Sequence, residues 1–284
     1  MQNLPPVSPS VKTQFDLTDK IVLITGGAGF LGQQFAEALA EMGAIPFIFD
    51  MQQEAIDKAV EHVRSQYGKC DGLKVDITNL PELKSAVLKV IEQYGRIDVL
   101  INNAALTKYT CEADPEAFFA PFENTSPEVW DAGIRVNLTG TANCCQVIGP
   151  IMVSQGKGSI INMASDVGVI SPDQRIYQPD EHGYKGQNFN TPAFYAVSKA
   201  GVIHLTKYLA TLWGLNGVRV NAFSPVGVYR NHEPDFVKIL SSRIPMGRMA
   251  LVNEYKGAIV FLASDASSFM TGHNLVMDGG RTIW

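Results

Sequence analysis

Residues 20–32 read Lys-Ile-Val-Leu-Ile-Thr-Gly-Gly-Ala-Gly-Phe-Leu-Gly, an apolar run that passes directly into a glycine-rich turn. The run at 21–24 is typical of a strand buried on both faces of a sheet. The glycines at 27, 29 and 32 then open a stretch with helical spacing of apolar residues. Strand, glycine turn and helix in this order predict the first βα turn of a dinucleotide-binding fold, because small residues let the backbone approach a pyrophosphate at the helix N-terminus. The alternative is a glycine turn that binds no nucleotide.

Strand-like and helix-like stretches alternate along the rest of the chain. We predict strands at residues 20–25, 44–50, 73–76, 97–103, 159–163, 218–223 and 274–278. We predict helices between Gly32 and Gly43 and at residues 53–67, 83–94, 127–153, 194–213 and 253–263. This alternation indicates βαβ units, and therefore a doubly wound α/β Rossmann fold whose seven-stranded parallel sheet lies between two layers of helices. No linker or repeat interrupts the alternation, so we expect a polar N-terminal tail at 1–17 and a single domain at 18–284.

The composition is that of an ordinary globular protein, with 46% hydrophobic and 18% charged residues. A net charge of -5 gives no basic footprint, which disfavours nucleic acid and anionic membrane as partners. The apolar runs are too short to span a bilayer, and residues 1–19 lack the apolar core of a secretory signal. The four cysteines form neither a disulfide framework nor a metal-ligand pattern. We therefore expect a cytoplasmic protein without a metal that acts on a small molecule.

Asp50 closes the second predicted strand, where a carboxylate can accept hydrogen bonds from both hydroxyls of an adenosine ribose. Its charge would repel a 2′-phosphate, and the following Met51 and Gln52 offer no cation to hold one. The sequence therefore favours NAD over NADP.

Tyr195 and Lys199 are four residues apart in a predicted helix, so they share one face of it. An ammonium beside a phenol favours the phenolate and lowers the pKa of the tyrosine, which makes a workable general acid or base near neutral pH. Taken alone, the pair is also compatible with a helical tyrosine beside a solvated lysine. The rest of the chain has to decide between these two interpretations.

A set of motifs recurs in a fixed order around this pair. It comprises Thr25-Gly26 with Gly32, Asp76 after the third strand, Asn102-Asn103-Ala104-Ala105, Asn137, Ser165, Tyr195 with Lys199, and Asn221-Ala222 with Pro225. Together these motifs resemble the single-domain type of the short-chain dehydrogenase/reductase superfamily over residues 18–284. Several of the motifs are weak alone, but the ordered set is specific.

The resemblance implies a catalytic set. Tyr195 would transfer the proton on the substrate oxygen, and Ser165 would hydrogen-bond that oxygen. Lys199 would hold the nicotinamide ribose and lower the pKa of Tyr195, while Asn137 would help hold a water that links Lys199 to solvent. Without the resemblance, Asn137 is a buried helix amide and Ser165 an ordinary serine at a strand end.

The resemblance also implies how a dinucleotide is held. Asp76 and Ile77 would contact the adenine, residues 103–105 would lie under the adenosine ribose, and the backbone at 225–228 would seat the carboxamide. The expected cofactor contacts are Gly26, Gly29, Phe30, Leu31, Gly32, Asp50, Met51, Asp76, Ile77, Asn103, Ala104, Ala105, Tyr195, Lys199, Pro225, Val226 and Val228. The cofactor would carry the hydride, and the protein would position it.

Three features depart from the superfamily pattern. Phe30 replaces a glycine, as in the extended branch of sugar-nucleotide epimerases and dehydratases, but the chain stops at Trp284 without that branch's second domain. Val226 follows Pro225 where glycine is expected, and no threonine follows soon after to bond the carboxamide. Ser165 and Tyr195 are also much further apart than in the pattern, because residues 171–192 are inserted between them.

Insertions at about 106–126 and 171–192 leave the carboxyl ends of predicted strands, where open α/β sheets bind ligands. We hypothesise that they roof the active site and recognise a polar or anionic substrate, with Arg175 as the favoured contact. The expected substrate contacts are Ser165, Val167, Arg175, Tyr177 and Tyr195. A solvated surface loop is the alternative. Residues 172–177 and 278–284 also resemble dehydrogenases linked to surface-polysaccharide or flagellin-sugar synthesis.

These expectations converge on an NAD(H)-dependent oxidoreductase that interconverts a secondary alcohol and a ketone on a sugar, sugar nucleotide or polyol. One alternative is an NADPH-dependent carbonyl or 3-oxoacyl reductase, which Asp50 disfavours. Another is a catalytically silent dinucleotide-binding protein, which would have no need of Tyr195. The resemblance further implies a homodimer or homotetramer that packs through the helices at 127–153 and 194–213.

Overall fold

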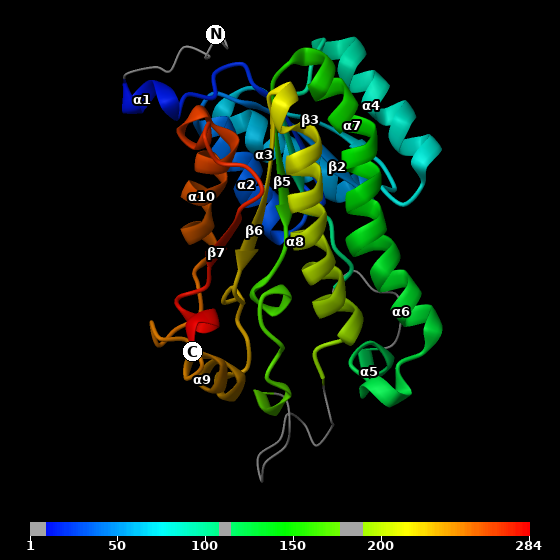
Figure 1. Ribbon diagram of the computed structural model, residues 1–284, viewed down its shortest axis with the longest axis vertical. Helices are drawn as coiled ribbons and strands as arrows, with labels where there is room; N and C mark the ends of the chain where they lie inside the picture. Colours follow the sequence, from blue (N-terminus) through cyan, green and yellow to red (C-terminus); the bar gives the residue numbers. More distant parts are fainter. Residues whose placement is uncertain (1–9, 108–114, 177–189) are drawn as a thin grey trace.

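The computed structural model describes residues 10–107, 115–176 and 190–284, and seven parallel strands form its central sheet (Figure 1). The strands are β1 (Ile21–Thr25), β2 (Ile45–Asp50), β3 (Asp71–Lys74), β4 (Val99–Asn102), β5 (Gly158–Met163), β6 (Val218–Pro225) and β7 (Asn274–Met277). Their order in the sheet is β3-β2-β1-β4-β5-β6-β7. The order therefore reverses between β1 and β4, which is the switch point of a doubly wound fold. The predicted fold class is confirmed.

Helices cover both faces of the sheet (Figure 1). One layer holds α2 (Phe30–Glu41), α3 (Gln53–Tyr67) and α10 (Lys256–Ala263), and the other holds α4 (Leu80–Tyr94), α7 (Thr141–Gln155) and α8 (Ala193–Trp213). The remaining α-helices are α1 (Val11–Gln14), α5 (Pro115–Phe118), α6 (Pro127–Ile134) and α9 (Pro234–Ser241). Among the described residues, none of the helices is long and apolar enough to cross a membrane.

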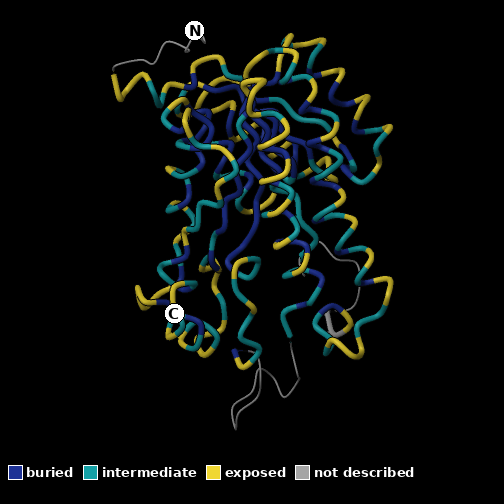
Figure 2. The backbone as a smooth tube through the Cα atoms, viewed as in Figure 1, coloured by how far each residue is buried: buried dark blue, intermediate teal, exposed yellow. Residues whose placement is uncertain are grey.

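The continuous apolar run of β1 follows from this layering. Val22 and Ile24 pack in the apolar cluster beneath α2 and α3, whereas Ile21 and Leu23 pack in the cluster beneath α4 and α7. Because both faces of the strand are covered, no position on it is left for a polar residue that faces water. Figure 2 shows the same result for the inner strands, which form the buried centre of the molecule, whereas the edge strands β3 and β7 are only partly buried.

Two predicted elements differ in detail from the observed ones. The helix predicted at 127–153 is interrupted by a π-helical turn, Arg135–Gly140, between α6 and α7. A π-turn inserts an extra residue into the helix, and such turns are frequent at functional sites. The strand predicted at 73–76 lies instead at Asp71–Lys74. Val75 donates the last hydrogen bond to β2, at Asp50 O, and the chain leaves the sheet after it.

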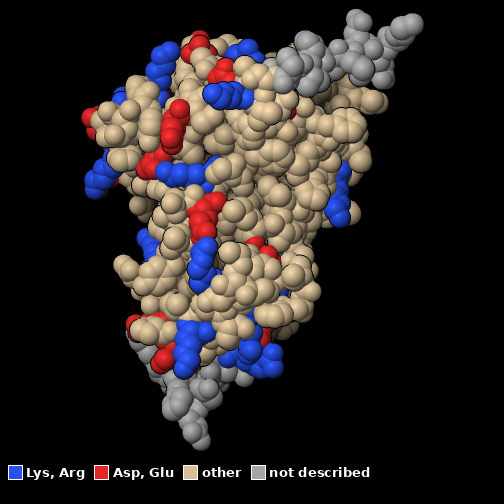
Figure 3. Space-filling model, turned by 90° about the vertical axis from the view of Figure 1, so that its left-hand side faces the viewer, with Lys and Arg blue, Asp and Glu red and all other residues tan. Residues whose placement is uncertain are grey.

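Charged side chains of both signs lie mainly at the top, along the left side and at the lower end of the face drawn in Figure 3. Within the described residues of that face, no continuous basic patch is visible. Among its described residues, this face has no basic surface of the kind that binds a polyanion.

Candidate active site

The carboxyl ends of the strands open onto a cavity of about 1370 Å³. The glycine turn before α2, the ends of β2, β4, β5 and β6, and the first turns of α8 contribute to its wall. All of the predicted cofactor contacts line this cavity except Gly32. The structure thus brings together residues from the whole length of the sequence at the edge where open α/β sheets bind ligands.

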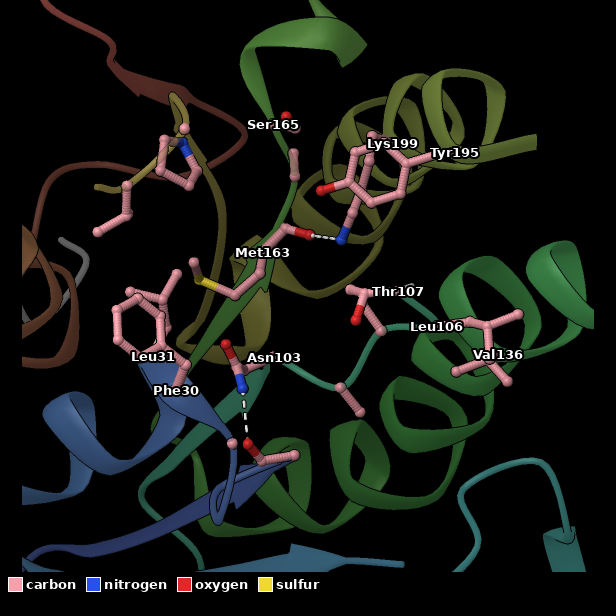
Figure 4. A pocket seen from close by; sticks show the side chains of 18 of the residues that line it. Phe30, Leu31, Asn103, Leu106, Thr107, Val136, Met163, Ser165, Tyr195 and Lys199 are labelled. Atoms are coloured by element: carbon pink, nitrogen blue, oxygen red, sulfur yellow. Dashed lines mark hydrogen bonds between the residues drawn. The ribbon is translucent and has the colours of Figure 1, made fainter. Parts of the chain in front are cut away.

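The glycine turn forms a close-packed cradle at the N-terminus of α2. Gly26 has a φ of +61°, and its carbonyl oxygen accepts a hydrogen bond of 2.9 Å from Asn103 Nδ2 (Figure 4). A Cβ on Gly32 would lie only 2.2 Å from the same carbonyl oxygen, so the turn can pack this closely on the helix only with glycine at position 32. Phe30, which departs from the superfamily pattern, is 38% exposed and lines the cavity, so the turn accommodates its ring. This cradle fits a pyrophosphate.

Two carboxylates lie at the end of the cavity formed by β2 and β3. Asp50 accepts hydrogen bonds from the backbone N–H groups of Ala28 (3.2 Å) and Met51 (2.8 Å). Asp76 accepts one from the Thr78 N–H at 2.8 Å. The backbone therefore fixes both side chains where the adenosine half of a dinucleotide is expected.

Tyr195 and Lys199 share one face of α8, as predicted. Lys199 Nζ lies 5.6 Å from the centre of the Tyr195 ring and donates a hydrogen bond of 2.7 Å to Met163 O at the end of β5 (Figure 4). Lys199 is only 3% exposed, and this burial lowers its pKa from 10.5 to about 8. The ammonium is thus not the solvated lysine of the alternative interpretation.

Ser165 and Asn137 approach the pair from other elements. Ser165 follows β5, lines the cavity and donates a hydrogen bond of 2.7 Å to Asp166 Oδ1. Asn137 lies in the π-helical turn, where its Oδ1 accepts the Leu106 N–H at 2.6 Å. Its Nδ2 is buried without an acceptor among the described residues, and Asn137 does not line the cavity. The water-holding role of Asn137 therefore stays a prediction.

Comparison with known proteins decides the family. A family model described as "Enoyl-(Acyl carrier protein) reductase" matches residues 27–282. D-threitol dehydrogenase from Mycolicibacterium smegmatis is 33% identical over 279 residues, which cover 96% of this chain and 97% of that protein. The chain belongs to the short-chain dehydrogenase/reductase superfamily. As a member, it is an oxidoreductase that acts on alcohols.

Other superfamily members share the fold over nearly their whole length. A 3-oxoacyl-[acyl-carrier-protein] reductase from Thermotoga maritima is 36% identical, with 94% of this chain and 99% of that protein covered. An NAD+-bound xylitol dehydrogenase superimposes with a TM-score of 0.80 at 28% identity, with 93% and 99% of the two chains covered. A gluconate 5-dehydrogenase from Burkholderia cenocepacia, in complex with NADP and tartrate, superimposes with a TM-score of 0.82 at 29% identity, with 97% and 100% covered.

The described parts of the two insertions contact each other. The Asn190 N–H donates to Phe119 O at 3.1 Å. Beside this contact, the ring of Phe118 stacks edge to face at 5.4 Å on that of Phe194 in the first turn of α8. Cavity-lining residues from the insertions are Leu106, Thr107, Pro172, Asp173, Ile176 and Thr191. These contacts are consistent with the roof hypothesis, which stays a hypothesis.

The predicted substrate contacts have different surroundings. Val167 lines the cavity together with Ser165 and Tyr195. Arg175 does not: its side chain is 75% exposed, and its Nε donates to Asp173 Oδ1 at 2.8 Å. The geometry thus gives no support to Arg175 as a substrate contact, while Tyr177 lies outside the described residues.

Sequence reasoning missed several charged residues of the cavity wall, and three of them lie near the predicted site residues. Asp166 and Arg281 form a buried ion pair there, although they are distant in the sequence. Arg230 lies with its guanidinium carbon 4.7 Å from the centre of the Phe30 ring. The one available signal was that Asp166 directly follows Ser165; nothing in the spacing points to Arg281 or Arg230.

Proposed function

We propose that the protein is an NAD(H)-dependent oxidoreductase that interconverts a secondary alcohol and a ketone on a polyol or a related sugar. The observation that carries the proposal is the buried Lys199 ammonium beside Tyr195, in the wall of a cavity that continues to the glycine cradle. A protein that only bound a dinucleotide would have no use for this arrangement. Relatives named for threitol and glycerol support the polyol class.

The residues around the reacting carbon have separate tasks in this proposal. NAD would accept the hydride from the alcohol carbon. Tyr195 takes the hydroxyl proton, and the adjacent Lys199 ammonium favours the phenolate that this step requires. Met163 O orients Lys199 through the hydrogen bond of 2.7 Å. Ser165 binds the substrate oxygen.

Asp50 supports NAD as the preferred nucleotide. Its carboxylate is fixed in the cavity wall by two backbone N–H groups, and the two residues that follow it in that wall, Met51 and Gln52, carry no positive charge. A 2′-phosphate there would meet a negative charge. Because relatives and structural neighbours include both NAD and NADP users, this preference needs its own test.

A substrate screen tests the proposal. The purified protein is offered threitol, glycerol, xylitol, mannitol, sugars and nucleotide sugars, each with NAD and with NADP, and reduction of the nucleotide is followed by absorbance. We expect NAD to be reduced by one or more polyols or sugars and NADP to be the poorer acceptor. Asp50→Asn should lower the ratio of kcat/KM with NAD to kcat/KM with NADP.

A second candidate function is reduction of a 3-oxoacyl thioester, which the 36% identical reductase favours. A screen in which no polyol or sugar reacts, while a 3-oxoacyl thioester is reduced with NADPH, would replace the first proposal by the second. The resemblance to polysaccharide and flagellin-sugar enzymes stays a prediction, and nucleotide sugars are in the screen for that reason.

A further inference from the structure

A buried ion pair lies directly beside Ser165. The Arg281 guanidinium, from the turn Arg281–Ile283 at the end of the chain, pairs with the Asp166 carboxylate. Asp166 is 3% exposed and Arg281 is 8% exposed, yet both line the cavity. Asp166 Oδ1 also accepts the Ser165 hydroxyl at 2.7 Å. The ion pair therefore lies in the cavity wall next to Ser165, in the same wall as Tyr195.

Asp278 fixes the segment that supplies Arg281. Its Oδ1 accepts the Gly280 N–H at 2.9 Å, and its Oδ2 accepts the Thr282 N–H at 2.7 Å.

Burial raises the pKa of Asp166, and the Arg281 guanidinium and the Ser165 hydroxyl oppose this rise. Buried ion pairs add little to stability compared with apolar residues of the same volume. A role at the cavity accounts for the pair better than stability does.

The positions of the oxygen atoms indicate what the pair can recognise. Ser165 Oγ, the expected partner of the reacting oxygen, and Asp166 Oδ1 are 2.7 Å apart. A serine hydroxyl, which can donate to the reacting oxygen, and a carboxylate oxygen, which can only accept, lie close enough together to bind the two oxygens on adjacent carbons. A carboxylate has about four acceptor sites, so Asp166 retains capacity for one more donor beyond Ser165, Arg281 and the Val167 N–H. Because Asp166 neutralises Arg281, the pair is also unsuited to an anionic substrate group.

We propose that Asp166, held in place by Arg281, accepts a hydrogen bond from the hydroxyl on the carbon next to the reacting one. The enzyme thereby selects neutral vicinal diols over alcohols with a single hydroxyl. The inference rests on the proposed function and narrows its substrate class. It also places polar recognition at Asp166 and not at Arg175, whose charge is paired with Asp173 at the surface.

Butane-2,3-diol and butan-2-ol test the proposal, because they differ only in the second hydroxyl. With NAD as acceptor, the wild-type kcat/KM should be about tenfold to a hundredfold higher for the diol, which is the range of a hydrogen bond to a charged group. The ratio should fall about threefold to tenfold in Asp166→Asn, because the neutral amide oxygen is a weaker acceptor than the carboxylate. It should also fall in Asp166→Leu/Arg281→Met, a variant that removes both charges together and leaves neither one unpaired.

The control is Glu254→Gln, which removes the carboxylate of the exposed ion pair with Arg248 outside the cavity wall. This variant should keep the wild-type ratio. A wild-type ratio of about one overturns the inference without any variant, and so does an unchanged ratio in both Asp166 variants. Turnover of polyols without diol selectivity would leave the proposed function standing. Failure of every alcohol and ketone to react would refute both.

Discussion

Because Lys199 is buried, the free energy of unfolding of the cofactor-free protein should increase as the pH rises through the alkaline range. Lys199 is 3% exposed, and desolvation lowers its pKa from 10.5 to about 8. Because the pKa is lower in the folded chain than in the unfolded chain, burial of the charge destabilises the fold fully below about pH 8. This penalty fades as the pH rises from about 8 toward 10.5, so the contribution of Lys199 to stability improves across that window.

The size of the effect follows from the shift. A change from 10.5 to about 8 corresponds to about 3 kcal/mol at the usual conversion of pKa units to free energy. Linkage releases about 2 kcal/mol of this between pH 7 and pH 9.5, where Lys199 is neutral in the folded chain and still largely charged in the unfolded one. Replacing Lys199 by methionine, which has a similar length and no charge, should abolish this dependence.

The assay compares Tyr195→Phe with Tyr195→Phe/Lys199→Met, so that the neighbouring phenol does not titrate. Urea unfolding at pH 7 and pH 9.5 gives the free energy of unfolding of each protein. The free energy of unfolding of the Lys199→Met protein, relative to that of the protein with Lys199, should fall by about 2 kcal/mol from pH 7 to pH 9.5. Loss of the hydrogen bond to Met163 O changes this free energy by the same amount at both pH values and so does not affect the difference. Lys207→Met, which alters an exposed lysine on the same helix, is the control and should show no such change. Parallel pH profiles with and without Lys199 would refute the reasoning.

Two further substitutions probe the cradle and the ion pair. Gly32→Ala places a methyl group 2.2 Å from Gly26 O, so the turn must shift. The Kd for NAD, measured by calorimetry, should therefore rise at least about tenfold. A Kd equal to that of the wild type would contradict the assignment of this turn as the pyrophosphate cradle. Arg281→Met leaves Asp166 buried without its cation and should lower the free energy of unfolding at pH 7 by about 3–5 kcal/mol. Most of that loss should be recovered in Asp166→Leu/Arg281→Met, and equal losses in the two proteins would argue against the unpaired charge as the cause.

Much of the fold could be predicted because its signals are local. The run at β1 is apolar throughout since its two sets of side chains enter two different clusters, and the glycine turn follows it at once. Tyr195 and Lys199 could be paired because helical periodicity alone puts them on one face of α8. The resemblance then supplied roles for Ser165 and Asn137 that spacing could not.

The parts that escaped prediction depend on contacts between distant segments. Arg281 meets Asp166 only because β5 and β7 end on the same side of the sheet, with β6 between them. The π-turn at Asn137 directly joins α6 to α7, so the stretch reads as one helix in the sequence. The position of the insertion beside the expected nicotinamide end favours Arg175 as a substrate contact, but Asp173, two residues earlier, pairs with it at the surface.

The central claim is that Tyr195 is the acid/base group of an NAD-dependent oxidoreductase, and Tyr195→Phe tests it most directly. Calorimetry with NAD and the absorbance of NADH formed from the best polyol of the screen are measured on the same preparation. The variant should bind NAD with a Kd close to that of the wild type, because the ring stays in place beside Lys199 and only the hydroxyl is removed. Its kcat should fall at least about a hundredfold, the lower range of general acid–base catalysis. Turnover at the wild-type rate would contradict the account.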